Sequence, residues 1–360
     1  MRAKVDTREA VGRVMMVGLE GTAITSIERS WLKLIRPSGV ILFRRNIESA
    51  DQVIELLREA TEIIGRNLLR AVDMEGGLVD RFRNLMGPMP APAEVYGTRN
   101  PDLYFRHGDL IGRAAHMLGF NTSFAPVLDL ALPESKHVMK SRVISARPSD
   151  VVHYASAFLS GLAKQEVYGC GKHFPGLGGG ALDSHMLMPV IDRPWAQMWR
   201  EDLAPYRELA HALPIVMVAH AAYPAVTQKT EPASISEHWI GRVLRKRIGY
   251  QGLVISDDME MGGILSQYGI GDAATLAITA GTDMIEICKD PALILGAYEA
   301  MLHKTERSSE FARLVRTSAR RVERWGERHV LIQTQTLRSP NPVRVEKLRA
   351  EIAQFREICS

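Results

Sequence analysis

The sequence of 360 residues has few cysteines and little excess of either charge. Its three cysteines, Cys170, Cys288 and Cys359, are odd in number and widely spaced, so they predict neither a disulfide framework nor a zinc site. This usage fits a reducing compartment. The 45 basic and 41 acidic residues give a formal net charge of +4. Because nucleic-acid binding usually needs a clustered basic face, this near balance argues against a nucleic-acid partner.

Long apolar runs are also missing. The N-terminal run, Val14–Leu19, is short, and acidic residues precede it within the first ten positions, so it does not resemble a secretory signal. The most apolar later run, Ile215–Ala222, is too short to span a bilayer. The glycines at 178–180 do not follow a first strand, as a dinucleotide-binding or phosphate-binding loop would. We therefore expect a cytoplasmic protein with no membrane partner and no cofactor.

Eight short apolar runs predict buried parallel strands, and helical patterns lie between most of them. Ser49 and Ser149 can each cap one of these helices. Strands that alternate with helices eight times indicate an α/β fold of the (β/α)8 TIM-barrel type rather than a doubly wound sheet. The eight runs are Arg13–Leu19, Gly39–Phe43, Leu68–Asp73, Ser123–Leu128, Val167–His173, Pro214–His220, Gly252–Asp257 and Asp283–Cys288.

Polar residues stand where these strands end, and in a barrel such positions converge on one mouth. They are Asn46, Asp73, Asp129, Lys172, His173, His220 and Asp257. We expect the barrel to occupy residues 1–307. Residues 308–360 should form a helical extension packed on it, with one helix, a break at Pro340 and Pro342, and a terminal helix.

Two strand ends carry acids that could be functional. Asp257 and Asp258 close an apolar run, and two acids in succession favour a function over a simple helix cap, because a charged group at a barrel mouth needs partners. Asp73 precedes Gly76 and Gly77, which allow a tight turn and the close approach of a ligand. Its carboxylate could bind ligand hydroxyl groups or close the turn through its own backbone.

A third strand ends in Lys172 and His173. A lysine there is costly unless it is paired or bound to a ligand. The following loop reaches Asp183-Ser184-His185, in which the aspartate can orient the imidazole and stabilise its charged form. Histidine titrates near neutrality, which suits proton transfer. An ordinary surface loop is the alternative. Because His173 and His185 lack the spacing of a zinc motif, we expect no metal.

The segment KHFPGLGGGALDSH, at 172–185, resembles the signature of glycoside hydrolase family 3 in its β-N-acetylglucosaminidase branch, which reads approximately KHFPGHG(D)xxxDSH. Seven further blocks match in order, so the resemblance covers about residues 10–305. These blocks are GVILFRRNI (39–47), AVDMEGGLVDRF (71–82), SFAPVLDL (123–130), IVMVAHAAYP (215–224), EPASIS (231–236), GLVISDDMEMGGI (252–264) and AGTDMIEIC (280–288).

The resemblance implies roles for particular residues. Asp257 is the expected nucleophile, His185 the acid/base and Asp183 its partner. The reaction implied is a retaining double displacement that removes terminal β-linked N-acetylglucosamine. The substrate would be a small carbohydrate or a muropeptide from peptidoglycan recycling, and the protein a monomer or homodimer. The positions implied to hold the sugar are Asp73, Arg81, Arg142, Lys172 and His173.

Some positions depart from the family pattern without removing a residue assigned to bond making. Met74 replaces Gln, Leu78 replaces Arg, Leu177 replaces His, Gly179 and Gly180 replace an Asp-Thr region, and Val143-Ile144 follows Arg142 in place of Ser and an aromatic residue. Two alternatives stay open. One is phosphorolysis or transglycosylation on the same scaffold, because a neutral histidine repels phosphate less than a carboxylate does. The other is a catalytically silent sugar-binding or sensing protein.

Overall fold

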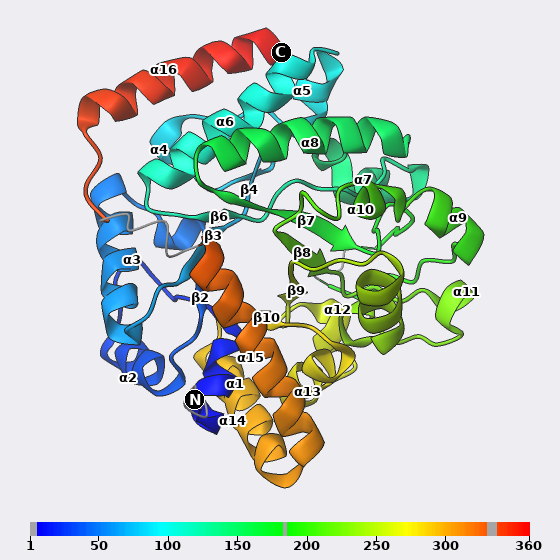
Figure 1. The fold of residues 1–360 in the computed structure, drawn as a ribbon. Coiled ribbons are helices and arrows are strands. Elements are labelled where there is room, and N and C mark those ends of the chain that lie inside the picture. The colour runs from blue at the N-terminus through cyan, green and yellow to red at the C-terminus, as the bar shows by residue number, and fades with distance from the viewer. Residues whose placement is uncertain (1–5, 183–185, 330–336) are drawn as a thin grey trace.

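The computed structural model describes residues 6–182, 186–329 and 337–360. Eight parallel strands close into a barrel in the order β1-β10-β9-β8-β7-β6-β3-β2 (Figure 1). They are β1 (Met15–Gly18), β2 (Gly39–Leu42), β3 (Leu69–Val72), β6 (Thr122–Ser123), β7 (Tyr168–Phe174), β8 (Ile215–Val218), β9 (Leu253–Asp258) and β10 (Met284–Ile287). Each predicted run overlaps one of these strands, which confirms the (β/α)8 TIM-type prediction.

Helices surround the barrel and bury their apolar stripes against it (Figure 1). α3 (Ala50–Ile64) begins after Ser49, whose hydroxyl accepts a hydrogen bond from the Gln52 amide, so that predicted cap is confirmed. The predicted cap at Ser149 is wrong. The N-cap of α8 (Pro148–Lys164) is Arg147, two residues earlier, because proline suits the first helical position. The other longer helices are α1 (Thr7–Arg13), α2 (Ser26–Ile35), α6 (Pro101–Met117), η5 (His238–Arg247), α13 (Ile270–Ala280) and α14 (Pro291–Arg307).

Three details differ from the prediction. The run at 123–128 forms a strand only as far as Ser123, since Pro126 has no amide hydrogen for a ladder; beyond it, Val127 makes a single bridge to Lys172. The helical pattern at 195–210 is split into α9 (Trp195–Arg200) and α10 (Ala204–Glu208). A small hairpin of β4 (Met74–Gly76) and β5 (Val79–Asp80) follows β3, and Gly76 and Gly77 turn it with positive φ angles of 95° and 59°.

The barrel is closed at its N-terminal end. Interior side chains from the strands form one buried cluster with Val322 and Trp325 of α15 (Ser309–His329). Trp325 packs edge-on against Tyr168 at the start of β7, and Arg321 pairs with Asp283 just before β10. With this end filled, the carboxyl ends of the strands are left to form the site, as is usual in such barrels.

The terminal helix α16 (Pro342–Cys359) packs on the outside of the barrel next to α4 (Arg83–Met86), α5 (Pro92–Gly97) and α6 (Figure 1). It buries Leu348, Ile352 and Phe355 in the main core, and Glu351 accepts a 3.1 Å hydrogen bond from Arg113 of α6. The boundary at residue 307 stays a prediction. Across the described ranges, each helix falls short of the length or the apolar character that crossing a membrane requires.

Candidate active site

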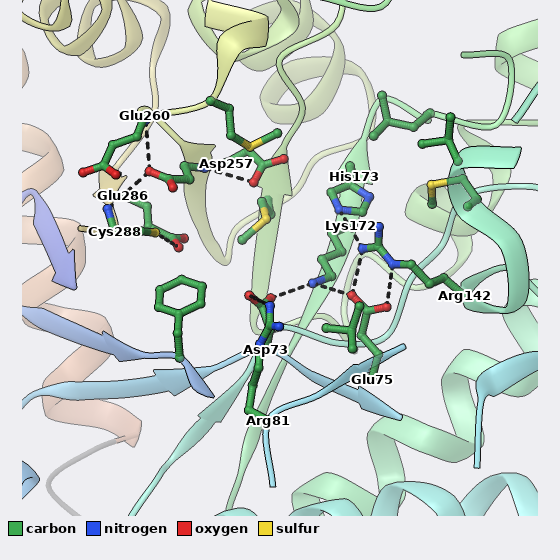
Figure 2. Close-up of a pocket in the computed structure, with 18 of the residues that line it drawn as sticks. Asp73, Glu75, Arg81, Arg142, Lys172, His173, Asp257, Glu260, Glu286 and Cys288 are labelled. Atoms are coloured by element: carbon green, nitrogen blue, oxygen red, sulfur yellow. Dashed lines mark hydrogen bonds and ion pairs between the residues drawn. The ribbon is translucent and has the colours of Figure 1, made fainter. Parts of the chain in front are cut away.

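A cavity of about 300 Å³ opens at the carboxyl ends of the barrel strands (Figure 2). Charged side chains line two facing halves of it. We call the first the paired half: Asp73, Glu75, Arg81, Arg142, Lys172 and His173. We call the second the acid half: Asp257, Asp258, Glu260 and Glu286. The cations Arg45 and Lys289 and several apolar side chains also line the cavity; the apolar ones include Phe43, Val79, Val138, Met139, Leu177, Leu182, Met217 and Met261.

Ion pairs connect the paired half. The ammonium group of Lys172, on β7, lies 2.9 Å from Asp73 and 2.7 Å from Glu75. Arg142 forms a two-pronged pair with Glu75, at 2.8 and 2.9 Å. Arg81 lies 3.4 Å from Asp73. These contacts join β3, the β4–β5 hairpin, β7 and the short helix η3 (Lys140–Arg142) across the cavity wall.

The pairing sets the charge of these groups. Burial alone would raise the pKa of Asp73, but Lys172 and Arg81 outweigh it and hold the pKa well below its usual range. Burial alone would lower the pKa of Lys172, but Asp73 and Glu75 raise it above the ordinary lysine value. The network therefore stays ionised at neutral pH and can offer both cationic donors and anionic acceptors to a ligand.

Asp129 holds the end of β7 in place through its carboxylate. Its carboxylate lies 2.7 Å from Nδ1 of His173 and accepts the Leu177 amide at 2.7 Å. A buried carboxylate needs such partners. Because the same group holds His173 and the start of the loop that follows, it orients the ring that lines the cavity.

The acid half has a different character. Among the described residues, none of its four carboxyl groups forms an ion pair. Asp257 accepts the Asp258 amide at 2.9 Å, and Asp258 accepts the amides of Glu260 and Cys288 at 3.0 and 3.2 Å. Burial, opposed by these amides and aided by neighbouring acids, raises the pKa of Asp258 to about 7.

Residues 6–325 match the model described as the glycosyl hydrolase family 3 N terminal domain. A beta-hexosaminidase from Thioalkalivibrio sulfidiphilus is 38% identical over 319 residues, which cover 87% of this chain and 91% of that protein. A beta-hexosaminidase from Idiomarina loihiensis is 36% identical over 299 residues, with coverage of 82% and 89%. The chain belongs to glycoside hydrolase family 3.

Solved structures of family 3 have the same fold. The β-N-acetylglucosaminidase from Paenibacillus sp. superposes with a TM-score of 0.89 at 28% identity, covering 98% of this chain and 69% of that one. NagZ from Neisseria gonorrhoeae, solved in complex with N-trifluoroacetyl-D-glucosamine, superposes with a TM-score of 0.77 at 29% identity, covering 95% and 97%. As a family 3 member, the protein is a glycosidase.

Six of the eight predicted site residues line this one cavity: Asp73, Arg81, Arg142, Lys172, His173 and Asp257. Asp183 and His185 lie outside the described residues. Three polar strand ends do not line the cavity: Asn46, His220 and Asp129, which holds His173 from outside the lining. Asn46 binds the Leu19 and Gly21 carbonyls, and Nε2 of His220 donates to the Asp258 carbonyl at 3.0 Å while Nδ1 accepts from Ser234. His220 thus braces the backbone beside Asp257.

Glu75, Glu286 and the role of Asp129 were not predicted from the sequence. A signal for Glu75 existed, because it follows Asp73 by two residues and a period of two places both side chains on one face of an extended chain. Glu286 interrupts the apolar run before Cys288, as Lys172 does on β7. The ion-pair partners of Glu75, Arg142 and Lys172, are distant in the sequence, so no local pattern shows the pairing.

The departures from the family pattern have separate environments. Met74 is buried in the main core, whereas Leu78 is 54% exposed. Leu177 lines the cavity, and its backbone rather than its side chain contacts Asp129. A side chain at Gly179 would come within 2.7 Å of Arg193. The loop that leaves β7 is therefore packed through backbone and apolar contacts.

Proposed function

We propose that the protein is a retaining β-N-acetylglucosaminidase that removes terminal, non-reducing β-linked N-acetylglucosamine. The observation that carries this proposal is the presence of Asp257, which has no ion-pair partner among the described residues, in one cavity with the paired half. At about 300 Å³ the cavity is at the small end of ligand pockets, which suits one sugar unit. The names of the relatives support the choice of sugar.

Asp257 would attack the anomeric carbon as the nucleophile and form a covalent glycosyl-enzyme. Its position at the end of β9 is rigid, because its own carboxylate accepts the next amide and His220 holds the following carbonyl. A carboxylate without a neighbouring ion-pair partner keeps its charge for the electron-poor anomeric centre. Water would then release the sugar in a second displacement, with retention of configuration.

The paired half would hold the sugar. Asp73 can accept hydrogen bonds from hydroxyl groups, while Arg81, Lys172 and Arg142 can donate to them. Because these groups already hold one another, little side-chain freedom is lost when the sugar binds. This pre-organisation supports a binding role for all five residues predicted to hold the sugar, including His173.

We assign the acid/base role to His185, with Asp183 as its partner, from the motif that they share with the family. The described beginning of the loop, at Leu177, is tied to Asp129 and therefore to the same carboxylate as His173. The natural substrate proposed is a peptidoglycan-derived fragment. The buried thiols of the three cysteines support a reducing, cytoplasmic setting.

A panel of p-nitrophenyl glycosides tests this function. We expect the highest kcat/KM for the N-acetyl-β-glucosaminide over the β-glucoside, and proton NMR should show the β anomer as the first product. Phosphate should leave the initial rate unchanged and give no sugar 1-phosphate. An α anomer as first product would contradict retention. Sugar phosphate would establish phosphorolysis, and binding without turnover would favour the sensing protein.

A further inference from the structure

Glu286 is a buried carboxyl group that the proposed reaction does not use. It lies on β10, is 3% exposed, and lines the cavity beside Asp257 (Figure 2). Oε1 accepts a hydrogen bond from the Cys288 thiol at 2.9 Å. Oε2 is buried and has no hydrogen-bond partner within the described residues. An unsatisfied buried oxygen is unfavourable and therefore calls for an explanation.

Within the described residues, no cation forms an ion pair with this carboxyl group. Lys172 binds Asp73 and Glu75, and Arg45 donates to the Leu19 carbonyl at 3.1 Å and to the Cys288 carbonyl. Burial raises the pKa of Glu286 well above the ordinary glutamate value, and neighbouring carboxylates raise it further. The neighbouring groups that act on its pKa are acids and a thiol: Asp73 after β3, Asp257 and Asp258 on β9, and Cys288 after β10.

We propose that Glu286 is a neutral carboxylic acid that donates a hydrogen bond from Oε2 to an acceptor oxygen of the sugar bound in this cavity. The proposal rests on the proposed function and adds a binding residue to it. Since Oε1 already accepts from Cys288, the proton belongs on Oε2.

This role differs from that of the other cavity acids. Ionised Asp73 accepts hydrogen bonds from sugar hydroxyls, whereas a neutral Glu286 gives one, so the two carboxyl groups would read different atoms of the same ring. Glu286 would not serve as the proton donor to the leaving group. That role is already assigned to His185.

Two variants separate this role from a purely structural one. Glu286→Gln keeps a donor at the place of Oε2 and an acceptor for the Cys288 thiol, and it is neutral at every pH. Glu286→Leu has a similar size but no hydrogen-bonding group. Thermal unfolding of each variant shows whether it folds, and Leu should be tolerated because a lone buried acid contributes little stability.

The test measures the dissociation constant of N-acetylglucosamine by calorimetry, together with kcat and KM for the aryl N-acetyl-β-glucosaminide, between pH 5 and pH 8. We expect Glu286→Leu to weaken binding by about five- to tenfold, the usual effect of one lost hydrogen bond. Glu286→Gln should recover most of that loss. The ratio of wild-type to Gln affinity should stay constant with pH, because neither side chain is charged.

Three results would overturn the proposal: unchanged affinity in Glu286→Leu, equally weak binding in Glu286→Gln, or an affinity ratio that changes with pH. The last two would mean that the wild-type group acts as a carboxylate. Wild-type protein that binds the sugar without turnover would refute the proposed function, while the binding data would still decide the role of Glu286. Wild-type protein that neither binds nor hydrolyses would refute both.

Discussion

The two halves of the cavity hold carboxyl groups in opposite electrostatic settings, two in the paired half and four in the acid half. In the paired half, Asp73 and Glu75 are ionised and form ion pairs with Lys172, Arg81 and Arg142. In the acid half, the carboxyl groups accept backbone amides or a thiol, and the pKa values of Asp258 and Glu286 are raised. Balanced charge makes a rigid binding surface, whereas uncompensated carboxyl groups keep reactivity available.

This difference predicts that damage to each half has a different consequence. Removing one member of the paired half leaves a buried charge without its partner, so the whole fold should suffer. Removing Asp257 breaks no ion pair within the described residues, so the reaction should suffer while the fold is preserved. Measuring stability and activity on the same variants therefore tests the comparison.

The largest effect is expected for Asp257→Ala. Loss of the nucleophile should lower kcat/KM for the aryl N-acetyl-β-glucosaminide by about 10⁴-fold or more. The midpoint of thermal unfolding should remain within a few degrees of wild type. Asp192→Ala, at an exposed aspartate outside the cavity lining, serves as the control and should keep full activity. A variant with more than a tenth of wild-type activity would remove Asp257 from the mechanism.

The next effect is expected for Lys172→Met, which leaves Asp73 and Glu75 with one cation fewer. Breaking a buried pair on one side should lower the free energy of unfolding by about 3–5 kcal/mol, measured by urea denaturation. The control Lys229→Met breaks an exposed pair with Glu231 and should cost about 0–1 kcal/mol. Equal losses in the two variants would show that the paired half is not a structural unit.

A smaller effect is expected for Arg142→Lys. Lysine cannot reproduce the two-pronged contact with Glu75, so unfolding should require about 1–2 kcal/mol less and the KM for the aryl substrate should rise. Arg147→Lys provides the comparison, because Arg147 is exposed and pairs with Asp150 at the surface. If both substitutions leave stability and KM unchanged, the two-pronged contact between Arg142 and Glu75 contributes to neither folding nor substrate binding.

The smallest effect concerns Asp258 and depends on pH. Its pKa is about 7 in the folded protein and about 4 in an unfolded chain. Between about pH 4 and pH 7, Asp258 is ionised in the unfolded chain but still protonated in the folded protein. Its contribution to the free energy of unfolding is therefore fully present below pH 4 and is lost as pH rises to 7. Asp258→Asn does not titrate. Its unfolding temperature should match wild type at pH 4 and exceed it by a few degrees at pH 8; a constant difference would contradict the raised pKa.

Much of the fold was predictable because buried parallel strands are continuous apolar runs, and all eight were found. The β4–β5 hairpin was not predicted as strands, because its five strand residues are too few and too mixed in polarity to show an alternating pattern. The two-residue β6 was predicted too long, because Val127 and Leu128 continue the apolar run past Pro126.

The site was predictable where a charged residue ends a strand, as with Asp73, Lys172 and Asp257. The pairing was not, because it depends on which strands are neighbours. Lys172 meets Asp73 across 99 positions, and Glu75 meets Arg142 across 67. No local pattern carries that information. For the same reason the contrast between the two halves emerged only in the folded structure.

The central claim is that Asp257 makes a covalent bond to the sugar. A 5-fluorinated N-acetylglucosaminyl fluoride should form the glycosyl-enzyme faster than water can release it. The ring fluorine slows both displacements, and the reactive fluoride leaving group speeds only the first. Peptide mass spectrometry after a short incubation should then find one sugar per chain, attached at Asp257. A label on another residue, or stoichiometric turnover with no covalent adduct and an inverted product, would contradict the account.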